Sequence, residues 1–216
     1  MTEVATMFDP LAPDEAASAG TTPEPEREVW CSILPVPAGA PKAKPHPRLG
    51  RPTQWWQYCD AERRTLGFAC RFERPDGCKE ILPLIFCEGP GGRREWRWKG
   101  FPVPRPLYGL DRLAARPDAP VLVCEGEKTA DAAAALFPDH VVVTSPSGSK
   151  AAHMADWAPL QGRHVAVWPD HDAQGVGYAQ DVARLALKAG AASVAVVEVP
   201  AAFPAKWDLA DVPPAG

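Results

Sequence analysis

The chain shows two successive patterns of apolar residues, and they predict two kinds of β structure. Between residues 53 and 100, short β-prone runs alternate with turn-forming sequences such as DAERRT, RPDG and GPGG. From residue 121 onward, apolar runs without polar alternation are separated by segments with helical character. Strands of this second kind are buried on both faces, as in a parallel sheet covered by helices. We therefore expect a small antiparallel β-rich unit followed by an α/β unit.

The two patterns also predict where the individual elements lie. The strands expected in the first unit span residues 54–60, 67–73, 80–88 and 94–100. Prolines between 102 and 106 predict an extended link, which a short helix over 107–115 follows. The strands expected in the second unit span residues 121–126, 140–145, 164–168 and 193–199. The helices expected between them span residues 127–137, 149–160 and 175–190. The apolar stripe of the last helix consists of Val176, Ala179, Val182, Ala183 and Ala186.

The first 52 residues have the composition of a segment outside the two units. Residues 1–28 are rich in Pro, Glu, Ala, Ser and Thr and are expected to be disordered. Residues 29–37 carry apolar anchors that could dock, and 38–52 form a Pro-rich extended connector. The predicted division is a disordered or extended segment over 1–52, a β-rich basic subdomain over 53–116 and the α/β domain over 117–216.

Charge is unevenly distributed between these parts. The net charge of −4 combines −3 in residues 1–50, +5 in residues 51–116 and −6 in residues 117–216. A basic unit before an acidic one suggests a polyanion-binding face beside a carboxylate-rich site. No run approaches the roughly 18 apolar residues of a membrane span, and the N-terminus lacks a secretory pattern. A cytoplasmic protein without membrane contact is expected.

Six cysteines are scattered singly along the chain: Cys31, Cys59, Cys70, Cys78, Cys87 and Cys124. A zinc ribbon takes its ligands from close pairs such as CxxC, and the chain has no such pair. Convergence of the four cysteines between 59 and 87 on zinc is the alternative, but buried thiols in strands are favoured. No zinc is predicted.

Three carboxyl groups follow apolar strands of the second unit. Glu125 comes directly after VLVC, and Asp170 and Asp172 come after VAVW. Ligands of open parallel sheets gather beyond the carboxyl ends of the strands, and residues two apart in an extended segment point the same way. If the first and third strands are neighbours, Glu125 faces the two aspartates, and hard oxygen ligands of this kind hold Mg²⁺. The alternative is that the carboxylates cap helices or lie in solvent. His171, between the aspartates, is expected to be a spacer.

These residues resemble the Toprim domain, which is shared by bacterial primases, phage primase-helicases, topoisomerases, old-type nucleases and recombination-mediator proteins. The family's glutamate–glycine motif corresponds to VLVCEGEKTADA, at Glu125 and Gly126. Its central strand and small-residue turn correspond to VVVTSPSGSKAA, with Gly148 in the turn. Its DxD motif corresponds to VAVWPDHDAQG, at Asp170 and Asp172. The resemblance covers about the last 100 residues, in the family's order.

The EGEKTAD, SPSGSK and WDLADV sequences are most similar to Toprim domains of phage- and plasmid-type primase-helicases, which carry a β-rich segment before the Toprim domain. The resemblance implies a DNA primase of DNA replication, which transfers ribonucleotides onto a primer on a single-stranded DNA template. It implies Glu125, Asp170 and Asp172 as catalytic and metal-binding residues, with Mg²⁺ as cofactor and Mn²⁺ as a substitute. Nucleoside triphosphates and a replicative helicase, in the same chain or separate, are the implied partners. Because a zinc module and a helicase usually flank such cores, the chain is expected to be a fragment, a split subunit or a degenerate relative.

One position departs from the pattern of primases. Thr129 stands where primases often carry an aspartate, Asp131 is out of register, and Glu127 is expected to take over part of the role at the metal site. Two alternatives to primer synthesis therefore stay open. One is a metal-dependent Toprim nuclease with water as nucleophile, and the other is a non-catalytic nucleic-acid-binding module.

Basic and aromatic residues around these motifs are candidates for substrate contacts. Lys128, Gly148, Lys150 and Arg105 are expected to contact nucleotide phosphates, since the first three lie near strand–helix junctions that favour anions. Residues 94–99 supply a nucleic-acid-binding set: Arg94, Trp96, Arg97, Trp98 and Lys99. An ordinary strand with its indoles in the core and its basic groups in water fits those residues equally well. The WDLADV tail, with Trp207, Asp208 and Asp211, is expected to pack back on the sheet.

Overall fold

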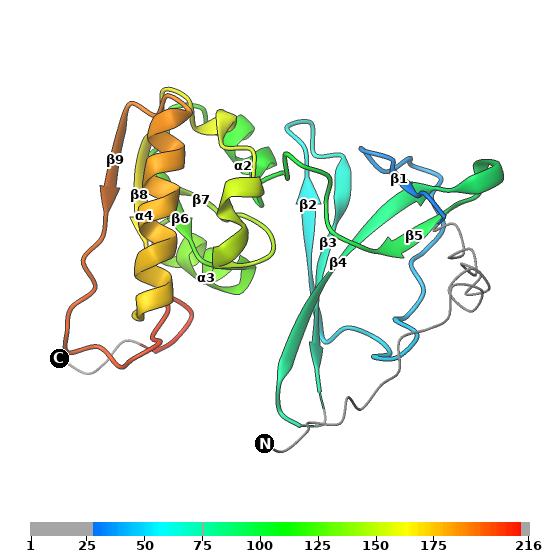
Figure 1. The fold of residues 1–216 in the computed structure, drawn as a ribbon. Coiled ribbons are helices and arrows are strands. Elements are labelled where there is room, and N and C mark those ends of the chain that lie inside the picture. Colours follow the sequence, from blue (N-terminus) through cyan, green and yellow to red (C-terminus); the bar gives the residue numbers. More distant parts are fainter. Residues whose placement is uncertain (1–27, 75, 213–216) are drawn as a thin grey trace, which may run out of the picture.

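The first half of the chain forms an antiparallel sheet that lies beside the α/β unit (Figure 1). A computed structural model describes residues 28–74 and 76–212. The strands of this sheet are β1 (Cys31–Ser32), β2 (Gln54–Cys59), β3 (Thr65–Glu73), β4 (Lys79–Glu88) and β5 (Arg94–Trp98). Their order is β1-β4-β3-β2, with β5 paired to β4, and a short 3-10 turn, η1 (Pro90–Gly92), joins β4 to β5. The antiparallel unit predicted from the period-two runs is confirmed.

Consecutive residues of this sheet face opposite sides, and each side has its own core. Trp56 and Ala69 belong to the core on the side of the α/β unit. Phe68, Cys70 and Leu84 belong to the core on the outer side. Because side chains alternate along a strand, neighbouring residues such as Trp55 and Trp56 lie on opposite faces of the sheet.

The segment before residue 53 takes part in this unit. Trp30 is buried in the core that faces the α/β unit, and β1 pairs with the end of β4. The apolar anchors in 29–37 therefore dock. The connector 38–52 lies against the outer face, where Leu49 packs on that core and His46 pairs with Gly50. Of residues 1–28, which were expected to be disordered, 1–27 lie outside the described residues, whereas Glu28 is ordered and forms a 2.9 Å ion pair with Arg93.

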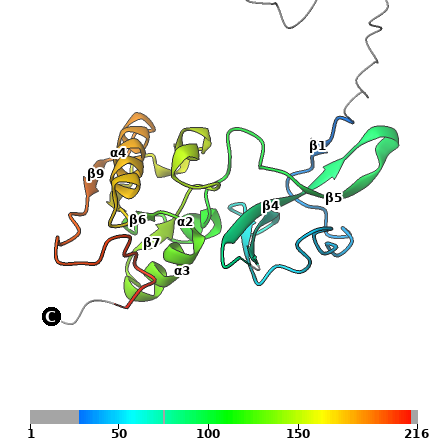
Figure 2. The same ribbon diagram turned by 60° about the horizontal axis from the view of Figure 1, so that its bottom comes forward.

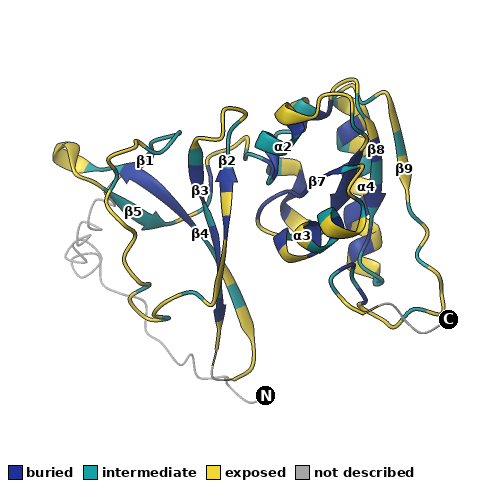
Figure 3. Cartoon of the chain, turned by 180° about the vertical axis from the view of Figure 1, so that it is seen from behind, coloured by how far each residue is buried: buried dark blue, intermediate teal, exposed yellow. Residues whose placement is uncertain are grey.

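The second unit is a four-stranded parallel sheet of order β7-β6-β8-β9, which confirms the predicted fold class. Its strands are β6 (Val121–Cys124), β7 (Val141–Val143), β8 (His164–Trp168) and β9 (Ser193–Val196). Its helices are α2 (Leu110–Ala115), α3 (Glu127–Leu136) and α4 (Ala173–Lys188). Val123 and Val167 pack with α4 on one face, whereas Leu122 and Cys124 pack with α3 on the other. Figure 3 shows β7 drawn as buried, whereas β9 at the edge of the sheet is drawn as exposed or intermediate. Among the described residues, no helix is long and apolar enough to cross a membrane.

The helix predicted over 149–160 was wrong. The segment forms two 3-10 turns, η2 (Ser149–Met154) and η3 (Ala158–Leu160), with Ala155 extended between them. The amide of Arg105 donates to the carbonyl of Met154, and the amide of Asp156 donates to the carbonyl of Arg105. This pairing with a distant part of the chain holds Ala155 extended, which an α-helix does not allow.

The apolar stripe predicted for α4 was wrong at one position. Ala179, Val182 and Ala186 are buried as expected, but Val176 is 49% exposed. Tyr178 takes the buried place instead, and its hydroxyl lies 3.0 Å from the hydroxyl of Ser145. A polar partner inside the fold thus turns the first turn of the helix away from the expected register.

The two units contact one another directly, and they lie side by side in both Figure 1 and Figure 2. The hydroxyl of Tyr58 in β2 donates a 2.6 Å hydrogen bond to the carboxylate of Glu127 in α3, and both side chains are buried. Tyr108, in the link between the units, exchanges backbone hydrogen bonds with Thr144 at the end of β7. The link is therefore held against the end of β7, the edge strand of the parallel sheet.

Candidate active site

Two of the predicted carboxylates meet at one edge of the parallel sheet. Strands β6 and β8 are neighbours, and their last residues, Cys124 and Trp168, are partners in the register. Glu125 follows the first strand directly, and Asp170 follows the second by two residues. The condition that the first and third strands of this unit are neighbours is therefore met, and their carboxyl ends bring Glu125 and Asp170 to the same place.

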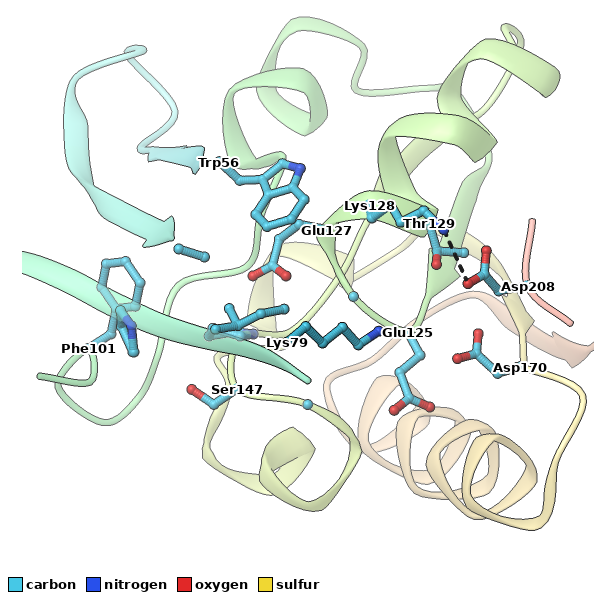
Figure 4. Close-up of a pocket in the computed structure, with 16 residues that line it drawn as sticks. Trp56, Lys79, Phe101, Glu125, Glu127, Lys128, Thr129, Ser147, Asp170 and Asp208 are labelled. Atoms are coloured by element: carbon cyan, nitrogen blue, oxygen red, sulfur yellow. Dashed lines mark ion pairs between the residues drawn. The ribbon is translucent and has the colours of Figure 1, made fainter. Parts of the chain in front are cut away.

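A pocket of about 530 Å³ lies in front of this edge, and both units contribute to its walls (Figure 4). Its lining from the α/β unit consists of Glu125, Gly126, Glu127, Lys128, Thr129, Pro146, Ser147, Gly148, Asp170 and Asp208. Its lining from the antiparallel unit and the link consists of Trp56, Ala69, Lys79, Ile81, Pro83 and Phe101. The first set carries charged groups, whereas the second is mostly apolar. The pocket thus has an ionic end and an apolar end, which matches a ligand with a charged part and a flat or apolar part.

Glu125 is held at the ionic end with one oxygen left unpaired. The side-chain amide of Gln174 lies 3.5 Å from Oε1 of Glu125 and donates a 2.7 Å hydrogen bond to the hydroxyl of Ser149. The other oxygen, Oε2, is buried and has no hydrogen-bond partner among the described residues. Burial raises the pKa of the Glu125 carboxyl, although the nearby polar groups of Ser149 and Gln174 oppose the rise. A buried carboxylate oxygen without a partner favours a cation beside it.

The surroundings of Asp170 disfavour a negative charge on its carboxyl group. Burial, followed by the nearby carboxyl groups of Glu125, Asp208 and Asp172, raises the pKa of Asp170 to about 7. The ammonium of Lys79 acts in the opposite direction. An added positive charge at this point would favour the ionised carboxylate, as bound cations generally do.

Asp172 lies beside the pocket and also begins α4. Its Oδ1 accepts a 2.8 Å hydrogen bond from the amide of Gly175, so the residue is the N-cap of the helix. The helix begins at Ala173, two residues before the expected start. Gly175 is required for another reason, since a Cβ there would lie 2.3 Å from the backbone oxygen of Asp170. One oxygen of Asp172 thus caps the helix, which is the alternative to metal binding that the sequence left open for these carboxylates.

The backbone around the pocket depends on glycine. Gly126 has φ 82° and ψ 155° between β6 and α3, and its amide donates to the hydroxyl of Thr144 at 3.0 Å. Gly148, in the predicted small-residue turn, has φ 75° and lies in the pocket wall. A Cβ at either position would meet no atom within 4 Å, so the positive φ alone makes these two glycines necessary.

Lysines from both units reach the ionic end. The ammonium of Lys128 lies 3.9 Å from the carboxylate of Asp208, and Figure 4 marks this ion pair. Lys79, the first residue of β4, reaches across from the antiparallel unit toward Glu125 (Figure 4). The sequence alone did not indicate Lys79 as a site residue, and it indicated Asp208 only for packing. The WDLADV tail was the available signal for Asp208, whereas the position of Lys79 depends on how the two sheets meet.

Two other carboxylates near Gly126 have different places. Glu127 lines the pocket but gives its carboxylate to Tyr58. Asp131 accepts a 2.8 Å hydrogen bond from the hydroxyl of Tyr108 and lies 3.8 Å from Arg112. Thr129 is buried in the pocket wall. The Glu127 carboxylate therefore already has a hydrogen-bond partner in the other unit, and the predicted role at a metal would draw on the same group.

The structure brings only some of the predicted phosphate contacts to the pocket. Lys128 and Gly148 line it, whereas Lys150 lies exposed on η2 and outside its lining. Arg105 also lies outside the lining and pairs through its backbone with residues 154–156.

The predicted nucleic-acid-binding residues of β5 are occupied by contacts within the antiparallel unit. Arg94 pairs with Glu88 at 2.6 Å and Arg97 with Glu95 at 2.8 Å. The ammonium of Lys99 donates to the carbonyl of Trp30. The rings of Trp96 and Trp98 pack against those of Phe86 and Phe72 and are half-buried. This is the arrangement expected of an ordinary strand, although Trp98 also borders a hollow on the outer face.

The C-terminal tail packs back on the sheet as expected. Trp207 and Leu209 are buried in the core beneath α3. His171 holds this tail, since its amide donates to the carbonyl of Trp207 and its Nδ1 lies 2.9 Å from the carbonyl of Pro204. The predicted spacer thus has a structural role, and it brings Asp208 to the pocket.

Divalent cation binding is compatible with this arrangement of donors. No group of three or more His, Cys, Asp or Glu side chains within residues 28–74 and 76–212 is gathered as a ready metal cage. Mg²⁺ does not require one, since it is usually bound by one or two carboxylates together with waters and substrate phosphates. The unpaired Oε2 of Glu125 and the raised pKa of Asp170 fit such a partial site.

Comparisons with known proteins give three findings. A family model described as a domain of unknown function, DUF6371, matches residues 93–171. A search of curated proteins finds no match. Solved structures with similarity include bacteriophage T7 lagging-strand DNA polymerase interacting with primase domains bound to an RNA/DNA hybrid and dTTP, with 17% identity, 68% coverage of this chain and a TM-score of 0.46.

Two further solved structures are similar in the same range. The primase fragment of the bacteriophage T7 primase-helicase has 16% identity over 68% of this chain, with a TM-score of 0.43. The zinc-binding and RNA polymerase domains of Aquifex aeolicus primase have 19% identity over 71% of this chain, with a TM-score of 0.44. The chain covers 65%, 53% and 34% of the three matched chains, which is less than two thirds of each.

Proposed function

We propose that this chain is a Toprim-type DNA primase core, which joins ribonucleotides on a single-stranded DNA template with the help of Mg²⁺. One observation carries the proposal: Glu125 and Asp170 meet at the carboxyl ends of adjacent parallel strands, in a pocket that also contains Lys79 and Lys128. Carboxylates for a cation and lysines for phosphates are the two sets of groups that phosphoryl transfer requires.

Each part of the pocket has a role in this proposal. Glu125 and Asp170 would hold Mg²⁺, with Asp172 contributing its second oxygen. The bound cation would neutralise charge on the attacking and leaving oxygens. Lys79 and Lys128 bind the triphosphate from opposite walls, and Gly148 allows the backbone to approach it. The apolar end, with Trp56, receives the base or sugar.

The proposed reaction balances without any further reactant. The 3′-hydroxyl of the growing primer releases its proton to water and attacks the α-phosphate of the incoming nucleoside triphosphate. A new phosphodiester bond forms, the bond between the α- and β-phosphates breaks, and pyrophosphate leaves. Lys79 and Lys128 stabilise the charge on the triphosphate oxygens during this step. Because Lys79 comes from the antiparallel unit, the reaction needs both units in place.

The test is primer synthesis on single-stranded templates of mixed sequence, with labelled ribonucleotides and Mg²⁺ or Mn²⁺. We expect short labelled products from the unaltered chain and a loss of at least about 100-fold in Asp170→Asn, since a ligand of the cation that would stabilise transition-state charge is removed. Arg184→Ala, in an exposed ion pair on α4, is the control and should keep full activity. Template cleavage without primers would instead indicate the nuclease, and binding without either reaction would indicate the non-catalytic module.

A further inference from the structure

A second hollow lies on the outer face of the antiparallel sheet, away from the catalytic pocket. We name it the outer groove, and it measures about 510 Å³. Its lining includes the basic side chains of Lys42, Lys44 and Arg51 and the rings of Trp55, Phe68 and Trp98, and we name these three rings its floor. Its remaining lining is Ala43, Pro45, Pro52, Cys70 and Leu84.

The strand alternation places the outer groove and the catalytic pocket on opposite faces of one sheet. Trp55 borders the outer groove, whereas the next residue, Trp56, borders the catalytic pocket. Phe68 and Leu84 likewise border the groove, and their neighbours Ala69 and Pro83 border the pocket. The two sites therefore cannot hold the same part of a ligand, and the outer groove needs an occupant of its own.

The charge of the outer groove is entirely positive. Lys42, Lys44 and Arg51 are exposed, and none of them forms an ion pair with a residue of the described ranges 28–74 and 76–212. No acidic residue contributes to the lining. The sequence 38–52 has four Lys or Arg residues and no Asp or Glu. This contrasts with β5, where each arginine has a carboxylate partner. A polyanion would find unpaired positive charge here.

The floor of the outer groove is aromatic and already ordered. Trp55 is 62% exposed, although the adjacent Trp56 is buried. Trp98 is fixed edge-on against both His46 and Phe72, at ring-centroid distances of 5.0 and 5.5 Å. Phe68 packs against Trp96 at 5.6 Å. The rings of Trp98 and Phe68, held in this way, lose little further freedom when a flat ligand packs on them, and the exposed ring of Trp55 is accessible for stacking.

We propose that the outer groove binds single-stranded nucleic acid, with phosphates on Lys42, Lys44 and Arg51 and a base stacked on Trp55. Unpaired basic groups along a groove with exposed aromatic rings are the combination that binds single strands without sequence preference. A duplex keeps its bases stacked inside and cannot place one on Trp55. The groove acts as a holding site on the far side of the sheet, and the proposal does not depend on the reaction in the catalytic pocket.

The experiment measures binding of a fluorescent single-stranded oligonucleotide of about 12 nucleotides to the full chain by anisotropy, at several salt concentrations. Trp55→Ala should weaken binding roughly tenfold, and Trp55→Phe should restore most of it because it keeps a stacking surface. The double variant Lys42→Glu, Lys44→Glu should lower the dependence of log K on log salt by roughly 1.4 or more. The matched control Arg184→Glu, Lys188→Glu changes the same charge on α4 and should bind as the unaltered chain does.

Heparin, a polyanion without bases, separates stacking from charge. Its binding should fall in the lysine variant and stay unchanged in Trp55→Ala. Oligonucleotide binding that is unchanged in both groove variants would overturn the proposal, and so would equal affinity for a duplex of the same length. A synthetic peptide of residues 1–27, with six acidic residues and one basic, is the competing occupant. If the peptide binds at Trp55 and the oligonucleotide does not, the groove receives the chain's own N-terminal segment and the proposal is wrong.

Primer synthesis assayed on the same preparations distinguishes the two proposals. If the unaltered chain makes no primers but the groove variants lose oligonucleotide binding, the groove proposal is supported and the primase proposal is refuted. Primer synthesis by groove variants with unchanged binding would support the primase and refute the groove. Far-ultraviolet circular dichroism of each variant verifies that it is folded, as expected for substitutions at exposed positions.

Discussion

Among the site carboxylates, Asp170 is the one whose ionised form the fold disfavours most clearly. Its ionisation therefore affects the stability of the folded chain. Its pKa of about 7 in the folded chain lies well above the value of about 3.9 in an unfolded one. The folded state therefore binds the proton more tightly, and the stabilisation is present below about pH 4 and is lost as pH rises through 7. Without a divalent cation, the charged Asp170 destabilises the fold at pH 8.

Asp170→Asn should consequently stabilise the chain at pH 8 in EDTA, by about 1–2 kcal/mol after allowance for solvent screening of a partly exposed group. At pH 4 the difference should vanish, because the native carboxyl is then neutral too. Thermal unfolding of both proteins at the two pH values measures this. Asp139→Asn, at an exposed position, is the control and should change stability little at either pH. A gain that is equal at both pH values would contradict the argument.

Mg²⁺ should stabilise the unaltered chain at pH 8 and leave Asp170→Asn almost unaffected. A cation that binds only the folded state adds about 2.7 kcal/mol when its free concentration is 100 times its Kd. Ionised Glu125 and Asp170 supply the charge, and one of the two is missing in the variant. The melting temperature as a function of Mg²⁺ concentration measures the effect without reference to activity. Identical curves for the two proteins would place the cation elsewhere.

At the scale of single residues, the sequence indicated the acidic groups but not all of their surroundings. Glu125, Asp170 and Asp172 could be located because strand ends and a two-residue spacing are local features. Lys79 could not be located, since it lies at the start of β4 and reaches the site only through the packing of one unit on the other. The capping role of Asp172 was an open alternative, and the geometry of the first turn of α4 decides it.

At the scale of elements, the start of α4 is set by close approach to the preceding loop. A Cβ on Gly175 would lie 2.3 Å from the oxygen and 2.7 Å from the nitrogen of the Asp170 backbone. These are backbone atoms that cannot move without displacing the site. The same helix offers a matched control at Gly177, where a Cβ would meet nothing within 4 Å.

Gly175→Ala should therefore destabilise the chain by about 1–3 kcal/mol, as overpacking does, even though alanine favours a helix. Gly177→Ala should stabilise it by up to about 1 kcal/mol, because only the propensity changes. Urea unfolding of both variants gives the comparison. If Gly175→Ala is as stable as Gly177→Ala, the loop at Asp170 can move away and the close approach is not a constraint.

Element prediction from the sequence succeeded where the pattern was local and failed where a distant partner intervened. All four strands of the parallel sheet and the order of the units followed from runs of apolar residues. The segment 149–160 looked helical from its alanines, but pairing with Arg105 keeps its middle extended. The strand β1 was missed as a strand, since two residues carry no periodicity and its pairing partner lies more than 50 residues away.

At the scale of the whole molecule, the proposed reaction depends on how the two units are held together. The catalytic pocket takes Lys79 and Trp56 from one unit and Glu125 and Asp170 from the other. The buried hydrogen bond between Tyr58 and Glu127 is a direct polar link between them, and its residues are 69 positions apart. No sequence pattern pairs two such residues. Division into two units was predictable, but the contact that unites them was not.

Tyr58→Phe should destabilise the chain by about 1–3 kcal/mol, because it leaves the buried Glu127 carboxylate without its donor. Glu127→Leu should also be destabilising, since it removes the acceptor of a buried hydroxyl. The double variant should lose less than the sum of the two, with a coupling of at least about 0.5 kcal/mol, because no polar group is then left unpaired.

The same double-mutant cycle tests whether the link matters for the pocket. If the hydrogen bond holds the two walls of the pocket together, Tyr58→Phe should raise KM for the nucleotide more than it lowers kcat. The reason is that Lys79 and Lys128 would then be positioned to bind the triphosphate together for a smaller fraction of the time. The double variant should keep the raised KM although it loses less stability than the two single variants together, because partial recovery of stability does not replace the lost alignment. An unaltered KM in the double variant would show instead that the hydrogen bond only supports folding and that the packing of Tyr58 against Phe101 and Tyr108 aligns the two units by itself.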